Sequence, residues 1–451
     1  PPEAGGLGPD SHVVVVGSGP AGIFAALPLA LAGARVTLLE RGASLENRHK
    51  KLVPFHRGGP LDPNTNLLYG EGGAGTYSDG KLYTRVDDPL EAPILQELID
   101  AGAPREIAFD ARAHIGTDRL HTVLPNLRRR LQELGVEFAW DTLFEGLVLD
   151  DGPPARVRAV RTSSGEVEAD AVVLALGHSA RDSMSMLLEQ GLVLIPKPFQ
   201  FGVRVEHSQE LVTAGRYGTG AAAQQLGPAS YALVAKAGDG LPGAHSFCMC
   251  PGGKIVASVS EEGALCTNGM SNSTHSSPFA NAAIVVTVRP EAFLEHGSGP
   301  LAGLAWQRHY EQLFFRAGGS DYRAPAQRVP DFLAGRESSG ELRTSYTFGA
   351  CPGRIDQLLP AGVAAPLARA LERFDRAIPG FAGPDGLLVG VEARSSGPVQ
   401  MERDPHSRLA TGFTNLYPVG EGAGYAGGIM SAAIDGARSA HALCCGSKNQ
   451  S

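Results

Sequence analysis

The stretch HVVVVGSGPAGIFAALPLALAGARVTLLERG, residues 12–42, decides the fold that the sequence predicts. Four consecutive valines at residues 13–16 indicate a short strand that is buried on both faces. A GxGxxG string, residues 17–22, follows this strand and leads into an alanine-rich helix and a second apolar run. Glu40 ends that run, about twenty residues after the glycines, where a carboxylate accepts hydrogen bonds from ribose hydroxyls. This order of elements predicts a dinucleotide-binding βαβ unit rather than an ordinary glycine-rich turn.

The residues of the glycine string each have a physical reason to lie beside phosphate groups. Gly17 suits the tight turn, Gly19 lets the backbone approach a pyrophosphate, and Gly22 allows close packing of the helix on the strand. The first turn of the helix adds unpaired N–H groups and the positive end of the helix dipole. We therefore assign to the nucleotide the whole string and the two charged residues after the second run: Gly17, Ser18, Gly19, Pro20, Ala21, Gly22, Glu40 and Arg41.

Length and composition describe a folded protein of more than one domain. A chain of 451 residues exceeds what one hydrophobic core usually organises, so we expect two domains. A net charge of −8 argues against nucleic acid or an anionic membrane as the main partner, which leaves a small-molecule substrate. The first twelve residues carry no basic segment followed by an apolar one, and the six cysteines have the irregular spacing of free thiols. We expect no signal peptide and a cytoplasmic location.

A second glycine-rich stretch, GEGGAGTYSDGKL, occupies residues 70–82. Its glycines permit positive φ angles and close approach of the backbone, and its consecutive N–H groups can form a nest for an anion. The alternative is a mobile surface loop. We place five residues of this stretch in the nucleotide site: Gly73, Ala74, Gly75, Thr76 and Ser78.

Patterns along the rest of the chain predict an α/β fold. Residues 117–134 have apolar residues at helical spacing, a β-meander follows, and residues 170–177 form a buried strand. From about residue 196, short Val-rich strands separated by Gly, Pro and Ser indicate a mostly antiparallel region. We expect a Rossmann-like domain, with a parallel sheet and the meander, and a mostly antiparallel α+β substrate domain. The predicted division assigns 11–195 to the first domain, 196–385 to the second, and 386–446 to a segment that returns to the first.

The chain closes with a third glycine-rich segment, residues 415–429, which leads into a helix. A strand pattern ends there on Gly420 and Glu421, and the helix begins after Gly427 and Gly428, which suits a phosphate or ribityl chain. The string that begins at Gly218 imitates a second dinucleotide fingerprint. No apolar strand precedes it, so we reject it.

Several longer strings resemble those of one known family. These strings are GEGGAGTYSDGKL, ALGHSARD, SFCMCPGG, TNGMS, VEARSSGPV and GEGAGYAGGI. They resemble the poorly characterised bacterial FAD-dependent dehydrogenases, within the glutathione-reductase-type FAD/NAD(P)-binding superfamily. The resemblance extends from about residue 11 to about residue 440. Members of that family carry an additional domain ahead of the Rossmann segment, and this chain begins close to that segment.

The resemblance implies FAD as the cofactor and gives roles to the motif residues. The first glycine string holds the FAD pyrophosphate, Glu40 holds the adenosine ribose, and the backbone of Phe144 meets the adenine. The strand end matches the family's Ala-Thr-Gly with leucine for threonine, and the late motif matches its Gly-Asp with glutamate for aspartate. The resemblance places Leu176 and Gly177 at the strand end and Gly420 and Glu421 at the ribityl chain. It places Gly427, Gly428 and Ile429 beside the flavin ring.

Three residues are candidates for the chemistry beside the flavin. His245 is the leading general base, because an imidazole of ordinary pKa suits that role; its alternative is a satisfied polar residue between strands. Tyr425 is expected to form a wall of the pocket or to donate a hydrogen bond. Arg394 is expected to bind a substrate carboxylate or to form a structural ion pair. His178 is expected to help hold the cofactor.

Cys248 and Cys250 form a C-x-C pair. Flavin disulfide reductases of the superfamily use C-x-x-C or C-x4-C, and C-x-C alone makes no zinc site. We expect the two thiols to point apart and to act as small packing residues without a catalytic role, and we expect no metal.

The expected function is that of an FAD-dependent oxidoreductase, either a dehydrogenase or an oxidase. It would transfer a hydride between flavin N5 and a small organic substrate held between the two domains. One alternative is a single-component flavin monooxygenase using NAD(P)H and O2, although the Asp-Gly and Gly-Asp-Ala-Ala-His strings of that class are not evident. Another is a non-catalytic flavin-binding redox sensor, because a fold does not fix a function.

Overall fold

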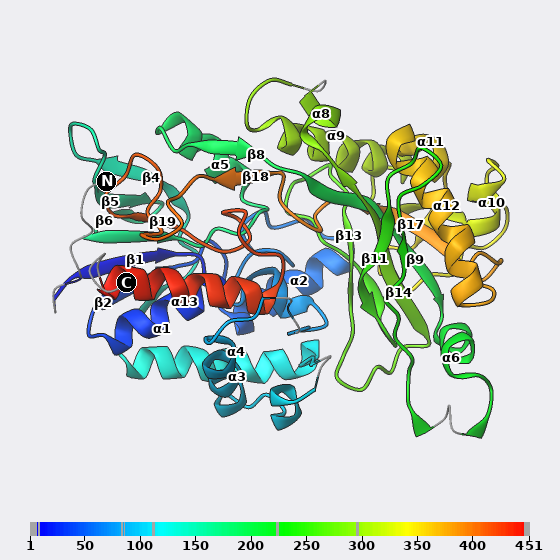
Figure 1. Cartoon of the computed structure of the whole chain (residues 1–451), viewed down its shortest axis with the longest axis horizontal. Coiled ribbons are helices and arrows are strands. Elements are labelled where there is room, and N and C mark those ends of the chain that lie inside the picture. Colours follow the sequence, from blue (N-terminus) through cyan, green and yellow to red (C-terminus); the bar gives the residue numbers. More distant parts are fainter. Residues whose placement is uncertain are drawn as a thin grey trace.

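The computed structural model describes residue 7, residues 10–82, residue 84, and residues 86–110, 113–221, 225–294 and 297–445. Figure 1 shows a parallel sheet with its helices on one side of the molecule and a larger, mostly antiparallel sheet on the other. The predicted α/β class with two such parts is confirmed. Residue 446, the end of the predicted return segment, lies outside the described residues.

The first part is built on a five-stranded parallel sheet with the order β19-β7-β1-β2-β3. The valines of β1 are at most 4% exposed, because Val13 and Val15 pack under helices and Val14 and Val16 pack under the meander. The strands are β1 (His12–Val16), β2 (Arg35–Leu39), β3 (Glu137–Ala139), β7 (Ala171–Leu174) and β19 (Leu416–Pro418). A segment from the end of the chain thus completes the first sheet.

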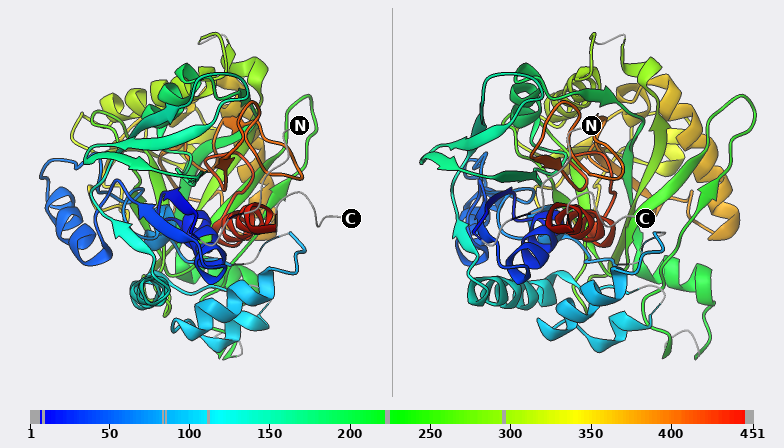
Figure 2. Two further views of the ribbon diagram at one scale, coloured as in Figure 1. Left: turned by 90° about the vertical axis from the view of Figure 1, so that its left-hand side faces the viewer. Right: turned by 60° about the vertical axis from the view of Figure 1, so that its left-hand side comes forward.

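Two helices lie side by side on one face of this sheet, as both views in Figure 2 show. They are α1 (Pro20–Leu31), which follows the glycine string, and α13 (Ile429–Cys445), which follows the last glycine loop. The helices α3 (Glu91–Asp100) and α4 (Thr117–Glu133) pack beside them. The other face carries the predicted meander, formed by β4 (Phe144–Leu149), β5 (Val157–Thr162) and β6 (Gly165–Glu168).

The second part is a seven-stranded sheet with the order β10-β11-β14-β9-β17-β15-β16, antiparallel except for the last pair. Its strands are β9 (Phe199–Ser208), β10 (Val234–Ala235), β11 (Ala244–Cys250), β14 (Phe279–Val288), β15 (Ala324–Arg328), β16 (Ala350–Pro352) and β17 (Leu387–Glu392). The strand β17 lies in the range predicted to return to the first domain, yet it pairs with β9 and β15 in this sheet. The predicted boundary at residue 386 is therefore too early, because the apolar run of β17 is buried inside the second part.

The two faces of the seven-stranded sheet differ in chemistry. Phe199, Phe201, Val203 and Val205 of β9 enter the main core, together with residues of α9 (Ala302–Ala317) and α12 (Ala361–Ala377). Because side chains alternate along a strand, the residues between them lie on the opposite face. We call this opposite face, which carries Gly202, Arg204, His245, Asn281 and Val285 in paired register, the inward face. It is turned toward the first part of the molecule (Figure 1).

The remaining elements are short or connect the two parts. The helices are α2 (Leu45–His56), α5 (Arg181–Glu189), α6 (Gln209–Tyr217), α8 (Pro290–Phe293), α10 (Val329–Leu333) and α11 (Ile355–Leu358), with 3-10 helices at Gly73–Tyr77 and Arg105–Ala108. Two small sheets pair β8 (Leu194–Pro196) with β18 (Val399–Met401) and β12 (Lys254–Ala257) with β13 (Thr267–Met270). Among the described residues, none of the helices has the length and apolar character needed to cross a membrane. The string at Gly218 follows a helix, α6; its residues 222 and 223 lie outside the described residues.

Candidate functional site

The glycine string after β1 contains two kinds of glycine. At Gly17 φ is +109°, and a Cβ atom would lie 2.3 Å from the carbonyl oxygen of Ala175. At Gly22 a Cβ atom would lie 1.8 Å from the carbonyl oxygen of Gly17. At Gly19 a Cβ atom would have no neighbour within 4 Å. Packing within the chain explains why Gly17 and Gly22 lack side chains, whereas the open surface at Gly19 fits the close approach of a ligand such as a pyrophosphate.

Three backbone segments meet at this opening. A Cβ atom on Gly73 would lie 3.2 Å from the Cα atom of Gly19, so the 3-10 helix begins directly beside the glycine string. A Cβ atom on Gly75 would lie 3.3 Å from Cγ1 of Ile429 and 4.0 Å from Pro20, the first residues of α13 and α1. The starts of two helices therefore converge on one place. Their unpaired N–H groups and positive dipole ends favour an anionic ligand there.

The second opening lies at the start of α13. Gly427 and Gly428 are exposed, and a Cβ atom on either would have no neighbour within 4 Å. Like Gly19, these two glycines are not required by packing within the chain. The residues present thus fit an extended dinucleotide cofactor that follows the chain from the glycine string to the start of α13.

Glu40 connects the loops around the first opening. It is 6% exposed, and its Oε2 accepts hydrogen bonds from the backbone N–H (3.0 Å) and the hydroxyl (2.7 Å) of Ser18. Its Oε1 accepts from the N–H groups of Gly42 (2.9 Å) and Gly70 (3.0 Å). A carboxylate has about four lone-pair positions, so these contacts use its whole capacity. A ribose hydroxyl at Glu40 would have to replace one of them, and the Ser18 hydroxyl can rotate away.

Several predicted side chains hold the loops of the site in place. The Thr76 hydroxyl donates to the carbonyl of Glu71 (2.7 Å) and the Ser78 hydroxyl to that of Gly75 (2.7 Å). Arg41 donates to both carboxylate oxygens of Asp182 (3.1 and 2.9 Å) and stacks over the ring of Tyr69. Ala74 is exposed on the 3-10 helix, and the buried side chain of Phe144 leaves only its backbone for a ligand.

The end of β7 and the last glycine loop lie against each other. A Cβ atom on Gly422 would lie 2.5 Å from the carbonyl oxygen of Gly177, the residue after Leu176. The Glu421 carboxylate lies 3.5 Å from Nδ1 of His178. The N–H of Gly420 donates to Oδ2 of Asp435 (2.7 Å), a buried residue of α13.

Sequence reasoning missed the ion pair that fixes this last loop. Asp435 is paired with Arg403 (2.6 Å) and Arg408, so its carboxylate stays charged while it holds the N–H of Gly420. Burial alone would raise the pKa of Asp435, but its two arginines and the Gly420 N–H bring the pKa below its usual range. A carboxylate on the buried side of an alanine-rich helix was the signal that could have identified this residue.

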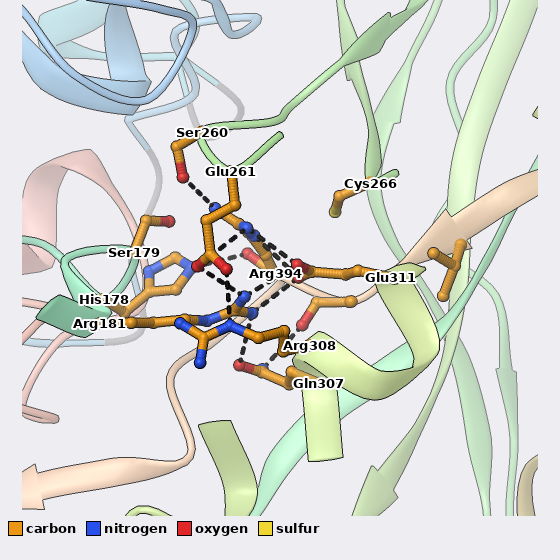
Figure 3. Close-up of polar contacts among 12 residues, drawn as sticks. His178, Ser179, Arg181, Ser260, Glu261, Cys266, Gln307, Arg308, Glu311 and Arg394 are labelled. Carbon is orange, nitrogen blue, oxygen red and sulfur yellow. Dashed lines mark hydrogen bonds and ion pairs between the residues drawn. The ribbon is translucent and has the colours of Figure 1, made fainter. Parts of the chain in front are cut away.

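A buried ion cluster joins the two parts of the molecule. Arg394 donates to both oxygens of Glu311 (2.9 and 2.9 Å), and Arg181 also donates to both (2.8 and 2.9 Å). We call these three residues the Glu311 cluster. Figure 3 shows the two guanidinium groups approaching the Glu311 carboxylate from separate segments. Arg181 belongs to α5, Arg394 follows β17, and Glu311 belongs to α9. Burial alone would raise the pKa of Glu311, but the two arginines lower it to about 2.

Comparison with known proteins agrees with this geometry. Residues 10–185 match a family model described as FAD binding domain, and residues 198–395 match one described as FAD-dependent protein, C-terminal domain-like. An uncharacterized protein from Clostridium beijerinckii is 44% identical over 425 residues, which cover 94% of this chain and 79% of that protein. The chain belongs to this family of FAD-dependent proteins. The dinucleotide that the glycine loops fit is therefore FAD.

Solved structures give more distant similarities. Glycine oxidase from Geobacillus kaustophilus is 13% identical, with 94% of this chain and 93% of that chain covered and a TM-score of 0.37. L-Amino acid deaminase from Proteus myxofaciens in complex with anthranilate is 14% identical, with coverage of 98% and 91% and a TM-score of 0.37. CtdE in complex with FAD is 12% identical, with coverage of 95% and 83% and a TM-score of 0.36.

Arg394 and Tyr425, both candidates for chemistry in this FAD-dependent protein, make defined contacts within the chain. Arg394 is 5% exposed and belongs to the Glu311 cluster. This contact corresponds to the second of the two expectations for Arg394, a structural ion pair. Its third nitrogen donates to the Ser260 hydroxyl (2.8 Å). A substrate carboxylate at Arg394 would compete with Glu311. The Tyr425 hydroxyl donates to the Met401 carbonyl (3.0 Å), and the Arg403 guanidinium lies 3.6 Å from its ring centroid. Both contacts fix Tyr425 within the first part of the molecule.

His245 lies in β11, near the edge of the seven-stranded sheet. It lies on the inward face, paired with Val285 of β14 and Val234 of β10, and it is partly exposed. Its neighbour Ala244 enters the main core, so alternation along the strand puts His245 on the inward face.

A second buried ion pair lies on the inward face. Arg204 is fully buried; its Nε donates to Glu392 (2.7 Å), and its other nitrogens donate to Asn281 (3.2 Å), Asn268 (2.6 Å) and the Cys248 carbonyl (3.0 Å). We call Arg204 with these four partners the Arg204 cluster. Burial raises the pKa of Glu392, since the single arginine only partly compensates. An arginine between two valines, Val203 and Val205, in a strand pattern was the signal for this cluster.

The two cysteines beside this cluster contradict the sequence expectation. Their thiols were expected to point apart, but Cys248 and Cys250 are hydrogen-bond partners. The expectation was wrong because it misapplied the two-residue alternation of a strand, and because β11 is irregular here, with a register shift between Phe247 and Cys250.

Proposed function

We propose that this FAD-dependent protein is an oxidoreductase that transfers a hydride between a small organic substrate and the flavin. The observation that carries the proposal is the polar inward face of the seven-stranded sheet, set opposite the FAD-binding loops. A sheet face turned toward another domain is ordinarily apolar when its only task is packing. Here the inward face carries Arg204, His245 and a thiol pair. Ligand sites also occur preferentially between domains.

The chain's own residues have distinct tasks in this proposal. FAD, when bound, supplies the hydride acceptor, and the protein supplies position, proton transfer and exclusion of water. His245 is the residue proposed to take the substrate proton. The Glu311 cluster holds the two parts of the molecule in a fixed relative position, because its residues come from three separate segments. Arg204 and Arg394 orient other protein groups and do not bind the substrate.

Anaerobic mixing of the purified protein with pools of small metabolites tests the proposal. A substrate is recognised by bleaching of the flavin absorbance, and we expect at least one pool to bleach it. His245→Asn should slow bleaching by about 10²–10⁴-fold with FAD still bound. His406→Asn, at an exposed position in the first part of the molecule, is the control and should leave the rate unchanged. Loss of FAD in His245→Asn, or an unchanged rate, would remove the assigned role.

The same apparatus separates the alternatives. Bleaching by NADH or NADPH at about 1 s⁻¹ or faster, the low end of ordinary turnover, would favour a monooxygenase. Absence of bleaching by every pool and by both nicotinamides would favour a redox sensor.

A further inference from the structure

The strand that carries the two cysteines is irregular where they lie. The register of β11 with β14 shifts between Phe247 and Cys250, and Cys248 has a φ of +46°. A positive φ is strained for a residue with a Cβ atom, so the surrounding contacts must impose it. The result is that the Cys250 thiol lies against its neighbour and donates to the Cys248 carbonyl (3.4 Å), close enough for the two thiols to shift each other's pKa. Strained backbone of this kind gathers at functional sites.

Two cations hold the backbone of the pair. Arg204 donates to the carbonyl of Cys248 (3.0 Å), and the Lys81 ammonium donates to the carbonyl of Met249, between the two cysteines. The hydrogen bond with Cys250 lowers the pKa of Cys248 against the effect of burial, and Lys81 and Arg204 lower it further. The same hydrogen bond and burial raise the pKa of Cys250. The pKa of Cys248 is thus shifted toward the thiolate form, and that of Cys250 toward the thiol form.

The chain also makes room for this pair. Cys250 is fully buried, and a Cβ atom on Gly269 of β13 would lie 3.0 Å from its sulfur atom. Cys248 is partly exposed. The more acidic thiol is therefore also the more accessible one, which is the arrangement of an attacking cysteine with a resolving partner.

A single short loop connects the pair with the FAD site. The 3-10 helix begins at Gly73, beside Gly19, and Lys81 at the far end of the same stretch contacts the backbone between the cysteines. Lys81 is held there by Asp79 (3.0 Å), which in turn accepts a hydrogen bond from Ser271 after β13. The thiols and the FAD loops therefore share one set of contacts across the domain interface.

We propose that Cys248 and Cys250 form a redox pair that alternates between a dithiol and a disulfide and exchanges two electrons with the flavin. The proposal rests on the proposed oxidoreductase function and names thiol–disulfide chemistry as part of it. In the oxidising direction the Cys248 thiolate and the Cys250 thiol form one S–S bond. They release two electrons and the Cys250 proton, and the flavin is the acceptor of both. In the reverse direction the S–S bond breaks and the electrons and proton return.

Anaerobic titration of the air-oxidised holoenzyme with dithionite tests the pair. The wild-type protein should take up four electrons per flavin, two for FAD and two for the disulfide. Cys250→Ser should take up two and keep its FAD. Cys351→Ser, which removes a thiol of another strand, β16, is the control and should take up four. Alkylation before and after reduction, read by peptide mass, should show Cys248 and Cys250 protected only in the oxidised protein.

The outcomes separate this proposal from the function on which it rests. Uptake of two electrons by the wild type, with both thiols alkylated in the oxidised protein, overturns the pair and leaves the flavin function intact. Four-electron uptake that survives in Cys250→Ser also overturns it. Absence of flavin overturns the exchange and the proposed function together, and the peptide masses still report whether the disulfide forms. The mass measurement needs no variant, so a misfolded Cys250→Ser does not block the test.

Discussion

The Glu311 cluster, which joins the two parts of the molecule, and the Arg204 cluster, which lies within the second part, are both buried ion pairs, but their carboxylates behave in opposite ways. Glu311 accepts four hydrogen bonds from two arginines, and its pKa falls to about 2. Glu392 accepts one hydrogen bond from Arg204 and one from Ser395 (3.1 Å), and its pKa rises. Burial is nearly complete at both sites. The number of arginine contacts therefore decides whether a buried carboxylate is locked in its charged form or can change its charge.

The difference suggests a division of tasks. The Glu311 cluster has a fixed charge and links three segments, which suits a structural joint. The Arg204 cluster has an adjustable charge and touches the strained strand of the cysteine pair, which suits a site where electrons and protons move.

Removing the shared carboxylate should cause the largest loss of stability. Glu311→Ala leaves the guanidinium groups of Arg181 and Arg394 buried without a counter-charge, and we expect a loss of about 3–5 kcal/mol in the free energy of unfolding. Urea denaturation followed by circular dichroism measures it. Asp321→Ala is the control, because it removes an exposed pair with Arg323 and should cost at most about 1 kcal/mol. Similar losses in the two variants would contradict the role of a structural joint.

The dependence of stability on pH should differ in sign between the two carboxylates. The folded-state pKa of Glu311 is depressed from 4.5 to about 2, so its contribution of about 3 kcal/mol is complete above pH 4.5 and disappears as pH falls toward 2. The folded-state pKa of Glu392 is raised, so its contribution is complete at low pH and is lost as pH rises above 4.5. The urea midpoints of Glu311→Gln and Glu392→Gln should be measured over a range of pH. As pH rises, the difference in midpoint between wild type and variant should change in opposite directions for the two variants. Parallel curves would remove the distinction between the clusters.

A smaller effect is expected on the cysteine pair. Glu392→Gln removes a negative charge that opposes the Cys248 thiolate, so the pKa of Cys248 should fall further where Glu392 is ionised. At pH values below the pKa of Cys248, we expect iodoacetamide to alkylate Cys248 faster in Glu392→Gln than in wild type. The increase should be up to about tenfold, the effect of one pKa unit. Peptide mass spectrometry at several pH values measures it, with Cys445 as the exposed internal reference. A slower reaction at Cys248 would show that Glu392 supports the thiolate.

The smallest effect belongs to the edge of the Glu311 cluster. Arg308 pairs with Glu261 (2.6 Å) but is 45% exposed, and exposed pairs contribute little. Arg308→Ala should change the free energy of unfolding by about 1 kcal/mol or less, as measured by urea denaturation. A loss as large as that of Glu311→Ala would mean that the cluster extends to the surface.

The sequence predicted the FAD-binding part well, because its determinants are local. The strand of valines, the GxGxxG turn and the helix after it lie within thirty residues, and each constrains the next. The expectation that a ligand approaches the backbone at Gly19 is compatible with the open surface there.

The interface between the two parts was not predictable in the same way. Arg394 and Arg181 meet Glu311 from segments far apart in the sequence, so no spacing rule could pair them. The boundary at residue 386 failed because the apolar run of β17 fits either sheet by composition, and only its pairing with β9 decides. The cysteine pair was missed for a different reason. Side chains two residues apart in a regular strand lie on the same face, and the expectation placed these two on opposite faces.

Denaturing the purified protein tests whether the open glycines hold FAD. We predict that acid or heat releases one FAD per chain into the supernatant from the wild type. Gly19→Ala should fold normally, since its Cβ atom meets no protein atom within 4 Å, but should release little or no FAD. FMN in place of FAD, flavin that stays with the precipitated protein, or full FAD occupancy in Gly19→Ala would contradict the account.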